Sequence, residues 1–400
     1  MLWVGLSAVF DGAHLIVVPA LVAAAVNPDM KASALGLLSF VGLALAALVQ
    51  PWFGALSDRS RPRFSRLGFA GSGVLGTLVG LLGLMSVGAF WAIAIALVIT
   101  YVSASAIQAA QQALLPELFD ARQRGLAAGA KQFADLAGAA LAFAVLAALI
   151  RSGPTPALLA VAVVLALSYV VARLLVREPN LSARPRPAPV RPRVDMTLMR
   201  GTFGRLVTTR FVFLLATYAI GRFLVFLVQS RLGVSATAAA ATTAQLVALL
   251  TLATGISAVG WGMVADRVGR AKVSALGALL SAIGALGILA AGDLPGIAIA
   301  GIVLALGSGA FASANWAATA DAAPEGMAGR GLGIASVATW AAAACAGLLG
   351  PLVDATNVVS PGAGYVALLA VCALLFLLCV PLALGQRRAA GVDAFVAATR

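Results

Sequence analysis

Charge is scarce in this sequence. Only 14 of its 400 residues are acidic, and charged residues of both signs make up 10%, against about 25% in soluble globular domains. Hydrophobic residues make up 62%, and the mean hydropathy is +1.03. These values exclude an ordinary water-soluble domain and indicate that lipid surrounds most of the chain.

Residues that bind metals or form disulfides are also few. The chain has one histidine and three cysteines, Cys345, Cys372 and Cys379, whose spacing suggests neither a disulfide nor a metal site. No G-x-x-x-x-G-K-[ST] loop is present, so nothing in the sequence indicates a nucleotide-driven machine. We therefore expect a protein that is not an enzyme and that uses no cofactor and no metal.

Long apolar runs account for almost all of the sequence. A spanning helix needs about 20 mostly apolar residues, and a window of that length finds twelve candidates. The first run carries Asp11 and lacks a basic segment before it, which is typical of a permanent span and not of a cleaved signal peptide. The predicted spans are 2–26, 33–56, 67–87, 89–114, 126–150, 156–176, 209–231, 236–264, 272–291, 295–318, 331–352 and 364–385.

The basic residues lie on one side of these spans. The net charge of +13 is strongly basic, as in many nucleic-acid-binding proteins. The positions of the basic residues indicate another reason: if the first span starts in the cytoplasm, nearly all the arginines and lysines fall in cytoplasmic connections. Only Lys31, Arg151 and Arg231 fall on the other side. This positive-inside bias predicts a multi-pass protein of the cell membrane with both termini in the cytoplasm, in contact with anionic lipid and with no nucleic-acid partner.

The two halves of the chain repeat the same landmarks. Gly54–Arg59 after the second span matches Gly262–Arg267 after the eighth, and the aspartates of the two segments are 208 residues apart. Pro116 and Pro324, each followed by a glutamate, have the same separation. One spacing shared by two motifs predicts a tandem pair of six-helix units in the same orientation.

A segment rich in proline and arginine separates the halves and is typical of a linker. We predict an N-terminal bundle of residues 1–177, a cytoplasmic linker of 178–208, a C-terminal bundle of 209–386 and a cytoplasmic tail of 387–400. The predicted fold class is an all-α membrane protein, with twelve transmembrane helices in two pseudo-symmetric six-helix bundles.

The segment Gly262–Lys272 resembles the signature loop of the major facilitator superfamily, G-x-x-[AS]-D-[RK]-x-G-[RK]-x-[RK], at every position. The first copy has Arg61 in place of the second glycine. It resembles the loop of glycoside-pentoside-hexuronide cation symporters, except that Ser65 stands where a glycine is usual. The superfamily resemblance implies the major facilitator fold. The fifth span lacks the G-P-x-x-G run of many proton–drug antiporters, which disfavours a multidrug exporter.

In this superfamily the signature loop is understood to hold the cytoplasmic ends of the two halves together while the cavity faces outward. The resemblance implies such a gate here, and the alternative is that the same residues only anchor helix ends. The implied gate residues are Asp58, Arg59, Glu117, Arg124, Asp266, Arg267, Arg270, Glu325 and Arg330.

Polar side chains within the spans are the candidates for a solute or proton pathway, because charges within a bilayer are costly and usually face a wet interior. Two alternatives stay open: polar residues satisfy one another between helices, and Asp135 pairs with Lys131 along one helix face. The candidates are Asp11, His14, Gln108, Gln112, Asp135, Tyr218, Arg222, Gln229, Asn315 and Trp316.

Three of these candidates predict a coupling site. Asp11 and His14 are three residues apart, so on an α-helix they share a face. The repeat offset places His14 and Arg222 at equivalent positions of the first and seventh spans, which face each other across the cavity in this superfamily. An arginine at that depth needs an anion, either Asp11 or the solute, and competition between the two would couple protonation to transport. The alternative is that Asp11 and Arg222 are a static pair that fixes the packing of the two halves.

These observations predict a secondary active transporter, a proton-coupled symporter of a small polar or anionic solute, which works as a monomer by alternating access. An exporter of drugs or metabolites on the same fold is the alternative within transport. A membrane assembly factor or sensor on this fold, which transports nothing, is the alternative of another class.

Overall fold

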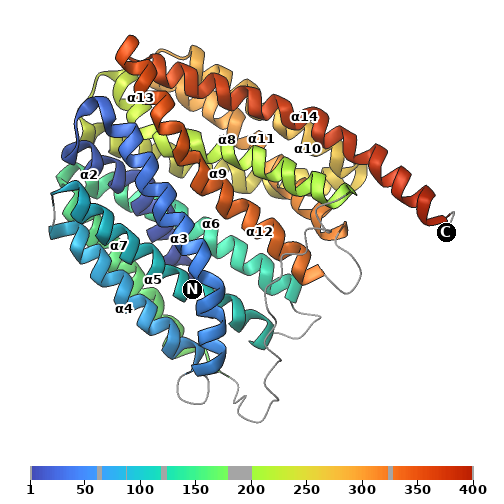
Figure 1. The fold of residues 1–400 in the computed structure, drawn as a ribbon, viewed down its shortest axis with the longest axis horizontal. Coiled ribbons are helices and arrows are strands. Elements are labelled where there is room, and N and C mark those ends of the chain that lie inside the picture. The colour runs from blue at the N-terminus through green and yellow to red at the C-terminus, as the bar shows by residue number, and fades with distance from the viewer. Residues whose placement is uncertain are drawn as a thin grey trace. The chain divides into compact units, whose positions relative to one another are not determined.

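The computed structural model describes residues 2–60, 65–86, 88–118, 124–178, 201–322 and 328–398, and every regular element among them is a helix (Figure 1). The chain divides into two compact units. The first unit comprises Met1–Pro192 with Val234–Ala248, and the second comprises Arg193–Gly233 with Leu249–Arg400. The all-α fold class predicted from the sequence is confirmed.

The helices of the first unit supply six of the apolar spans. The first span is not uniform, because a π-helical segment, η1, lies between two α-helical pieces. The elements are α1 (Leu2–Ser7), η1 (Ala8–Val17), α2 (Val18–Ala25), η2 (Pro28–Met30), α3 (Lys31–Ser60), α4 (Arg66–Ser86), α5 (Phe90–Leu118), α6 (Arg124–Leu149), η3 (Ile150–Ser152) and α7 (Pro154–Leu175).

The second unit follows the same plan, and α9 begins among the residues that group with the first unit. Its eleventh span is interrupted by a short 3₁₀ segment, η5, between Cys345 and Gly350. The elements are α8 (Gly201–Leu232), α9 (Ala236–Val268), α10 (Arg270–Ala290), α11 (Leu294–Asp321), α12 (Ala328–Cys345), η5 (Ala346–Leu349), α13 (Gly350–Val359) and α14 (Ala363–Ala398).

Twelve helical segments among the described residues are long and apolar enough to cross a membrane, which confirms the predicted number. Three boundaries differ from the predicted ones most clearly. Helix α8 begins at Gly201, so the last residues of the predicted linker 178–208 are helical. Helix α14 continues to Ala398, past the predicted start of the tail at residue 387. The eleventh span extends to Val359, beyond residue 352, because α13 restarts the helix after η5.

Glycine allows the closest helix approaches in both units. A Cβ on Gly80 of α4 would lie 2.7 Å from the backbone nitrogen of Thr100 on α5. In the second unit, a Cβ on Gly284 of α10 would lie 2.5 Å from the backbone nitrogen of Leu304 on α11. Small residues bring helices together in lipid, where burial of apolar side chains against each other adds little. Glycine therefore holds α4 against α5 and α10 against α11.

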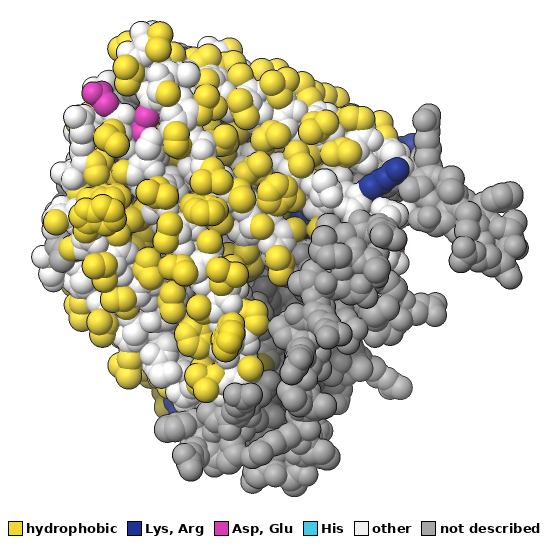
Figure 2. Space-filling view, in the orientation of Figure 1, with side chains coloured by type: hydrophobic (Ala, Val, Ile, Leu, Met, Phe, Trp, Pro, Cys, Tyr) yellow, Lys and Arg dark blue, Asp and Glu magenta, His cyan; other side chains and the backbone are white. Residues whose placement is uncertain are grey.

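Large apolar side chains cover much of the described surface (Figure 2). Trp52, Leu174 and Ile256 expose about three quarters or more of their surface, at 78%, 76% and 76%. Exposed apolar area on this scale marks contact with another apolar phase. Together with the length of the spans, it shows a protein whose helices face lipid.

Candidate functional site

Asp11 and His14 both lie in the π-helical segment η1 of the first span. A π-helix bonds residue i to i+5 and has a wider turn than an α-helix, and such segments often occur at functional sites. Because the turn is wider, residues three apart no longer share a face. The expected common face of Asp11 and His14 is therefore not formed, and the two side chains interact with different helices.

Asp11 interacts with the fifth span. Its half-buried side chain lies close enough to Asp135 of α6 for the two carboxyl groups to interact electrostatically. Asp135 accepts a hydrogen bond of 2.5 Å from the hydroxyl of Ser7, one turn before Asp11 in the first span. A Cβ on Gly12 would lie 2.9 Å from Leu146 of α6, so Gly12 helps η1 to approach that helix. Two acids and a hydroxyl thus lie in one region of the first unit.

His14 interacts with the fourth span. It is buried, and its Nδ1 is hydrogen-bonded to the hydroxyl of Tyr101 on α5. The Tyr101 ring is also buried and stacks on Phe10, with ring centroids 5.7 Å apart. A Cβ on Gly42 of α3 would lie 2.7 Å from the Tyr101 ring, so only glycine leaves room for it there. The structure thus identifies Tyr101 as the partner of the buried histidine.

The amides of α5 occupy different environments. Gln108 is buried, while Gln112 is exposed and accepts a hydrogen bond of 3.4 Å from Gln50 of α3. Gln111 was not a candidate, yet it is 6% exposed and both polar atoms of its amide lack a hydrogen-bond partner among the described residues. In the sequence, only its position next to the candidate Gln112 could have indicated Gln111 as a functional residue. Buried amides without partners are rare and often face a ligand or water.

Two arginines of α8 reach α12 in the second unit. Arg222 is buried, and its Nη2 donates a hydrogen bond of 2.8 Å to the carbonyl of Ala343. Arg210 donates from Nε to the hydroxyl of Thr339 at 3.1 Å, and its guanidinium carbon lies 4.8 Å from the ring centroid of Trp316 on α11. The sequence placed Arg210 among the topological charges, because it lies at the predicted start of the seventh span. The structure places its side chain inside the unit.

The other candidates of the second unit differ in environment. Asn315 is fully buried and donates from Nδ2 to the backbone carbonyl of Leu206 at 3.3 Å, so it joins α11 to α8. Trp316 is 40% exposed beside it. Tyr218 and Gln229 are half-buried on α8. Of this group, Asn315 has the contact expected of a residue that fixes helix packing.

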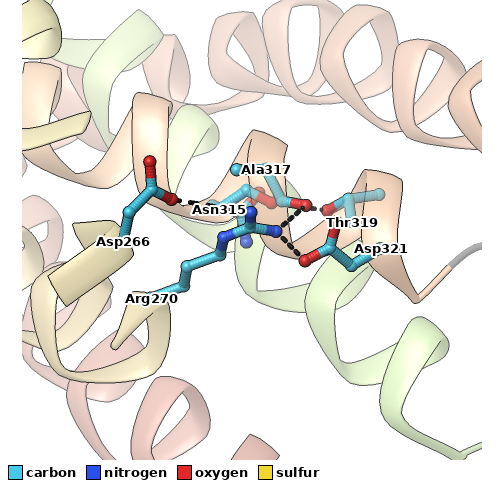
Figure 3. Close-up of polar contacts among 6 residues, drawn as sticks. All are labelled: Asp266, Arg270, Asn315, Ala317, Thr319 and Asp321. Atoms are coloured by element: carbon cyan, nitrogen blue, oxygen red, sulfur yellow. Dashed lines mark hydrogen bonds and ion pairs between the residues drawn. The ribbon is translucent and has the colours of Figure 1, made fainter. Parts of the chain in front are cut away.

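The second copy of the repeated loop carries a charged network (Figure 3). Arg270 at the start of α10 forms an ion pair with Asp321 at the end of α11 and donates 2.7 Å to the carbonyl of Ala317. Asp266 lies 3.6 Å from the other terminal nitrogen of Arg270, and Arg267 is exposed. Asp321 was not a candidate, since the residue 208 positions earlier is Ala113. The network fixes the α9–α10 connection against α11.

A different contact secures the matching end of the first unit. The carboxylate of Glu178 accepts hydrogen bonds from the backbone nitrogens of Arg66 and Leu67 at 2.7 and 2.8 Å, at the start of α4. The Arg66 guanidinium donates to Ser57 at 2.7 Å. The remaining gate candidates have side chains outside the part of the chain that the structure describes: Asp58, Arg59, Glu117, Arg124, Glu325 and Arg330, as does Lys131.

The predicted cluster of Asp11, His14 and Arg222 draws on both units. Within the first unit Asp11 interacts with Asp135 and His14 with Tyr101, and within the second Arg222 bonds to Ala343. The offset of 208 residues relates His14 to Arg222 and also Asp135 to Ala343. In each unit the first span is therefore joined to the fifth span, by Ser7 and Asp135 in the first unit and by Arg222 and Ala343 in the second. The pairing of Asp11 with Arg222 stays a prediction.

Comparisons with known proteins agree with the helical fold. The sequence profile described as Major Facilitator Superfamily matches residues 2–248 and 206–393, and no curated protein sequence matches the chain. A bacterial homologue of the human lysosomal transporter Spinster has 13% identity and a TM-score of 0.76, with 97% of this chain and 95% of that chain covered. A D-xylose–proton symporter has 18% identity and a TM-score of 0.72, with 96% of this chain and 95% of that chain covered. A peptide transporter in complex with alafosfalin has 15% identity and a TM-score of 0.73, with 97% of this chain and 93% of that chain covered. At these identities, the structures show a shared fold.

Proposed function

Because the chain belongs to the major facilitator superfamily, we propose that it is a proton-coupled symporter that moves a small polar or anionic solute by alternating access. It works as a monomer in the cell membrane, with both termini in the cytoplasm. The observation that carries the proposal is the set of ionisable and amide side chains within apolar spans of both units. Such groups are costly in a bilayer and are retained where a solute or an ion passes.

Proton coupling draws on Asp11 and its neighbours. Two ionised carboxylates repel each other strongly away from water, and the repulsion falls when one of them takes up a proton. Asp11 and Asp135 are two carboxyl groups that interact electrostatically. In the proposed cycle the solute anion competes with Asp11 for Arg222. When the solute binds Arg222, the carboxylate of Asp11 is free to take up a proton, which His14 relays. The gate closes the cytoplasmic ends while the solute site faces outward.

The substrate is found first, by thermal shift of the purified protein, because a ligand that binds only the folded state raises its melting temperature. The panel contains sugars including D-xylose, short peptides, organic acids, nucleosides and cationic drugs. A sugar, peptide or organic acid is the expected hit. A response confined to cationic drugs favours the exporter instead, and a protein that binds a partner protein but no solute favours the assembly factor.

Proteoliposomes then test the coupling with Asp11→Asn. This variant is expected to lose accumulation driven by a pH gradient while it keeps solute exchange in the absence of a gradient. Asp29→Asn is the matched control, since Asp29 is an exposed acid beyond the end of the same span, and it is expected to behave as the wild type. Normal pH-driven accumulation by Asp11→Asn would show that the proposed proton site is wrong.

A further inference from the structure

Arg210 and Arg222 converge on one turn of α12. Their Cα atoms are twelve residues apart on α8, which is about 18 Å along an α-helix. The groups they bond, the Thr339 hydroxyl and the Ala343 carbonyl, belong to residues four apart on α12, which is about 6 Å. The two side chains therefore lean toward each other, Arg210 from the N-terminal half of α8 and Arg222 from its C-terminal half.

Tyr218 lies between the two arginines on α8. Its phenol interacts electrostatically with the guanidinium groups of both Arg210 and Arg222. Tyr218 is half-buried, as is Arg210. A hydroxyl and two guanidinium groups thus share one region of the second unit, formed by α8 and α12.

The Arg210 guanidinium is held in place by contacts that use only one of its N–H donors. Its Nε bonds to Thr339, and its flat face lies over Trp316, an arrangement that favours a cation. The two terminal amino groups have no acceptor among the residues that the structure describes. A guanidinium presents its donors as a rigid fork that matches a carboxylate or phosphate group. The fork of Arg210 is therefore oriented and available.

The described carboxylates of the second unit's spans and connections interact elsewhere. Asp266 and Asp321 interact with Arg270, Asp293 accepts from the backbone of Gly296 at the start of α11, and Asp354 lies near Tyr365 at the far end of the eleventh span. Two positive charges within one part of a membrane-spanning unit are costly, and an anion that binds both of them offsets that cost.

We propose that Arg210 and Arg222, with Tyr218 and Trp316 beside them, form a binding site for the oxyanion group of an organic acid. The acidic group, phosphate or carboxylate, lies between the two guanidinium groups. The exposed part of the Trp316 indole packs against the body of the molecule. This inference rests on the proposed function and narrows its substrate class from small polar solutes to organic anions.

Thermal shift of the purified full-length protein tests the site with inorganic phosphate and with succinate, each against chloride at equal ionic strength. The two arms distinguish a phosphate site from a carboxylate site. At least one of the two anions is expected to raise the melting temperature with dose. Arg210→Gln and Arg222→Gln are expected to weaken its apparent affinity at least tenfold, and Arg210→Lys less, because lysine keeps the charge but loses the fork.

Arg205→Gln is the matched control. Arg205 is exposed on the same helix and donates to the carbonyl of Gly385, so its loss is expected to leave anion affinity unchanged. If Arg210→Gln fails to fold, Trp316→Leu and Thr339→Val remove the groups that orient the fork and are expected to weaken anion binding. Equal affinity in the wild type and the Arg210 variants, or no response to either anion, overturns the inference. The transport test with Asp11→Asn is independent of this result.

Discussion

A single carboxylate joins the end of the sixth span to the start of the third. Glu178 accepts hydrogen bonds from two backbone nitrogens of α4, which have no acceptor within the helix because they belong to its first turn. Glu178→Ala is expected to destabilise the folded protein by about 1–3 kcal/mol, since buried donors lose their acceptor. Thermal unfolding in detergent measures the effect as a lower melting temperature.

Glu178→Gln is the companion variant. Its amide oxygen can still accept one of the two hydrogen bonds, so its melting temperature is expected to lie between those of Glu178→Ala and the wild type. An alanine variant as stable as the wild type would mean that water replaces the carboxylate at the start of α4.

The sequence located polar residues better than it located their partners. Charged and amide side chains stand out in apolar spans, so Asp11, His14 and Arg222 were all found. Their contacts could not be predicted, because periodicity places a residue on a face of its own helix and does not say which helix packs there. Asp135 was considered as a partner of Lys131, whose side chain lies outside the described part of the chain. The structure adds Ser7, far away in sequence, as a donor to the Asp135 carboxylate.

At the scale of elements, the first span shows what hydropathy cannot detect. Its apolar run predicted one continuous span, and the structure has a π-helical segment in the middle. A π-helix and an α-helix need the same apolar composition, so composition does not distinguish them. The three-residue spacing that places two residues on one face of an α-helix therefore does not apply to Asp11 and His14.

The close packing of helix α10 against α11 can be tested by adding one methyl group, with a glycine-to-alanine substitution. A Cβ on Gly284 would lie 2.5 Å from the backbone of Leu304, so Gly284→Ala is expected to force the helices apart and to cost about 1–3 kcal/mol. The measurement is thermal unfolding in detergent or in lipid nanodiscs.

Gly260→Ala is its control on α9. A Cβ at Gly260 has no neighbour within 4 Å, and alanine is about 1 kcal/mol better than glycine within a helix. This variant is therefore expected to be as stable as the wild type or more stable. The same fall in melting temperature for both variants would contradict the close approach of α10 and α11.

At the scale of the whole molecule, the repeated loop predicts a conformational role. Asp266→Ala and Asp58→Ala are expected to leave membrane insertion intact and to lower turnover about tenfold, which corresponds to about 1.4 kcal/mol, because a gate biases conformational states without binding solute. Arg270→Ala is expected to do the same, since Arg270 joins Asp266 to Asp321 and Ala317.

Uptake into proteoliposomes at equal protein content measures these effects. Asp293→Ala is the control, because Asp293 lies at the other end of α11 and, among the described residues, bonds within the start of its own helix. Wild-type uptake by the Asp266, Asp58 and Arg270 variants would reduce these residues to anchors of helix ends.

The number of spans could be predicted because about 20 apolar residues in a row have few other uses in a folded protein. The tandem repeat could be predicted because two motifs share one spacing. Boundaries were less certain. Helix α8 starts at Gly201 and not at residue 209. A helix can continue beyond its apolar run into polar or basic residues, and a hydropathy window does not detect that part of it.

The cysteines have a practical consequence. Cys372 and Cys379 are fully buried, whereas Cys345 is partly exposed and lies two residues after Ala343, which bonds Arg222. Thiol reagents therefore meet a single accessible sulfur in the unaltered chain. Because maleimides react with thiolate in water, the rate at which a water-soluble maleimide modifies Cys345, read by intact mass, reports whether water reaches this depth of the eleventh span.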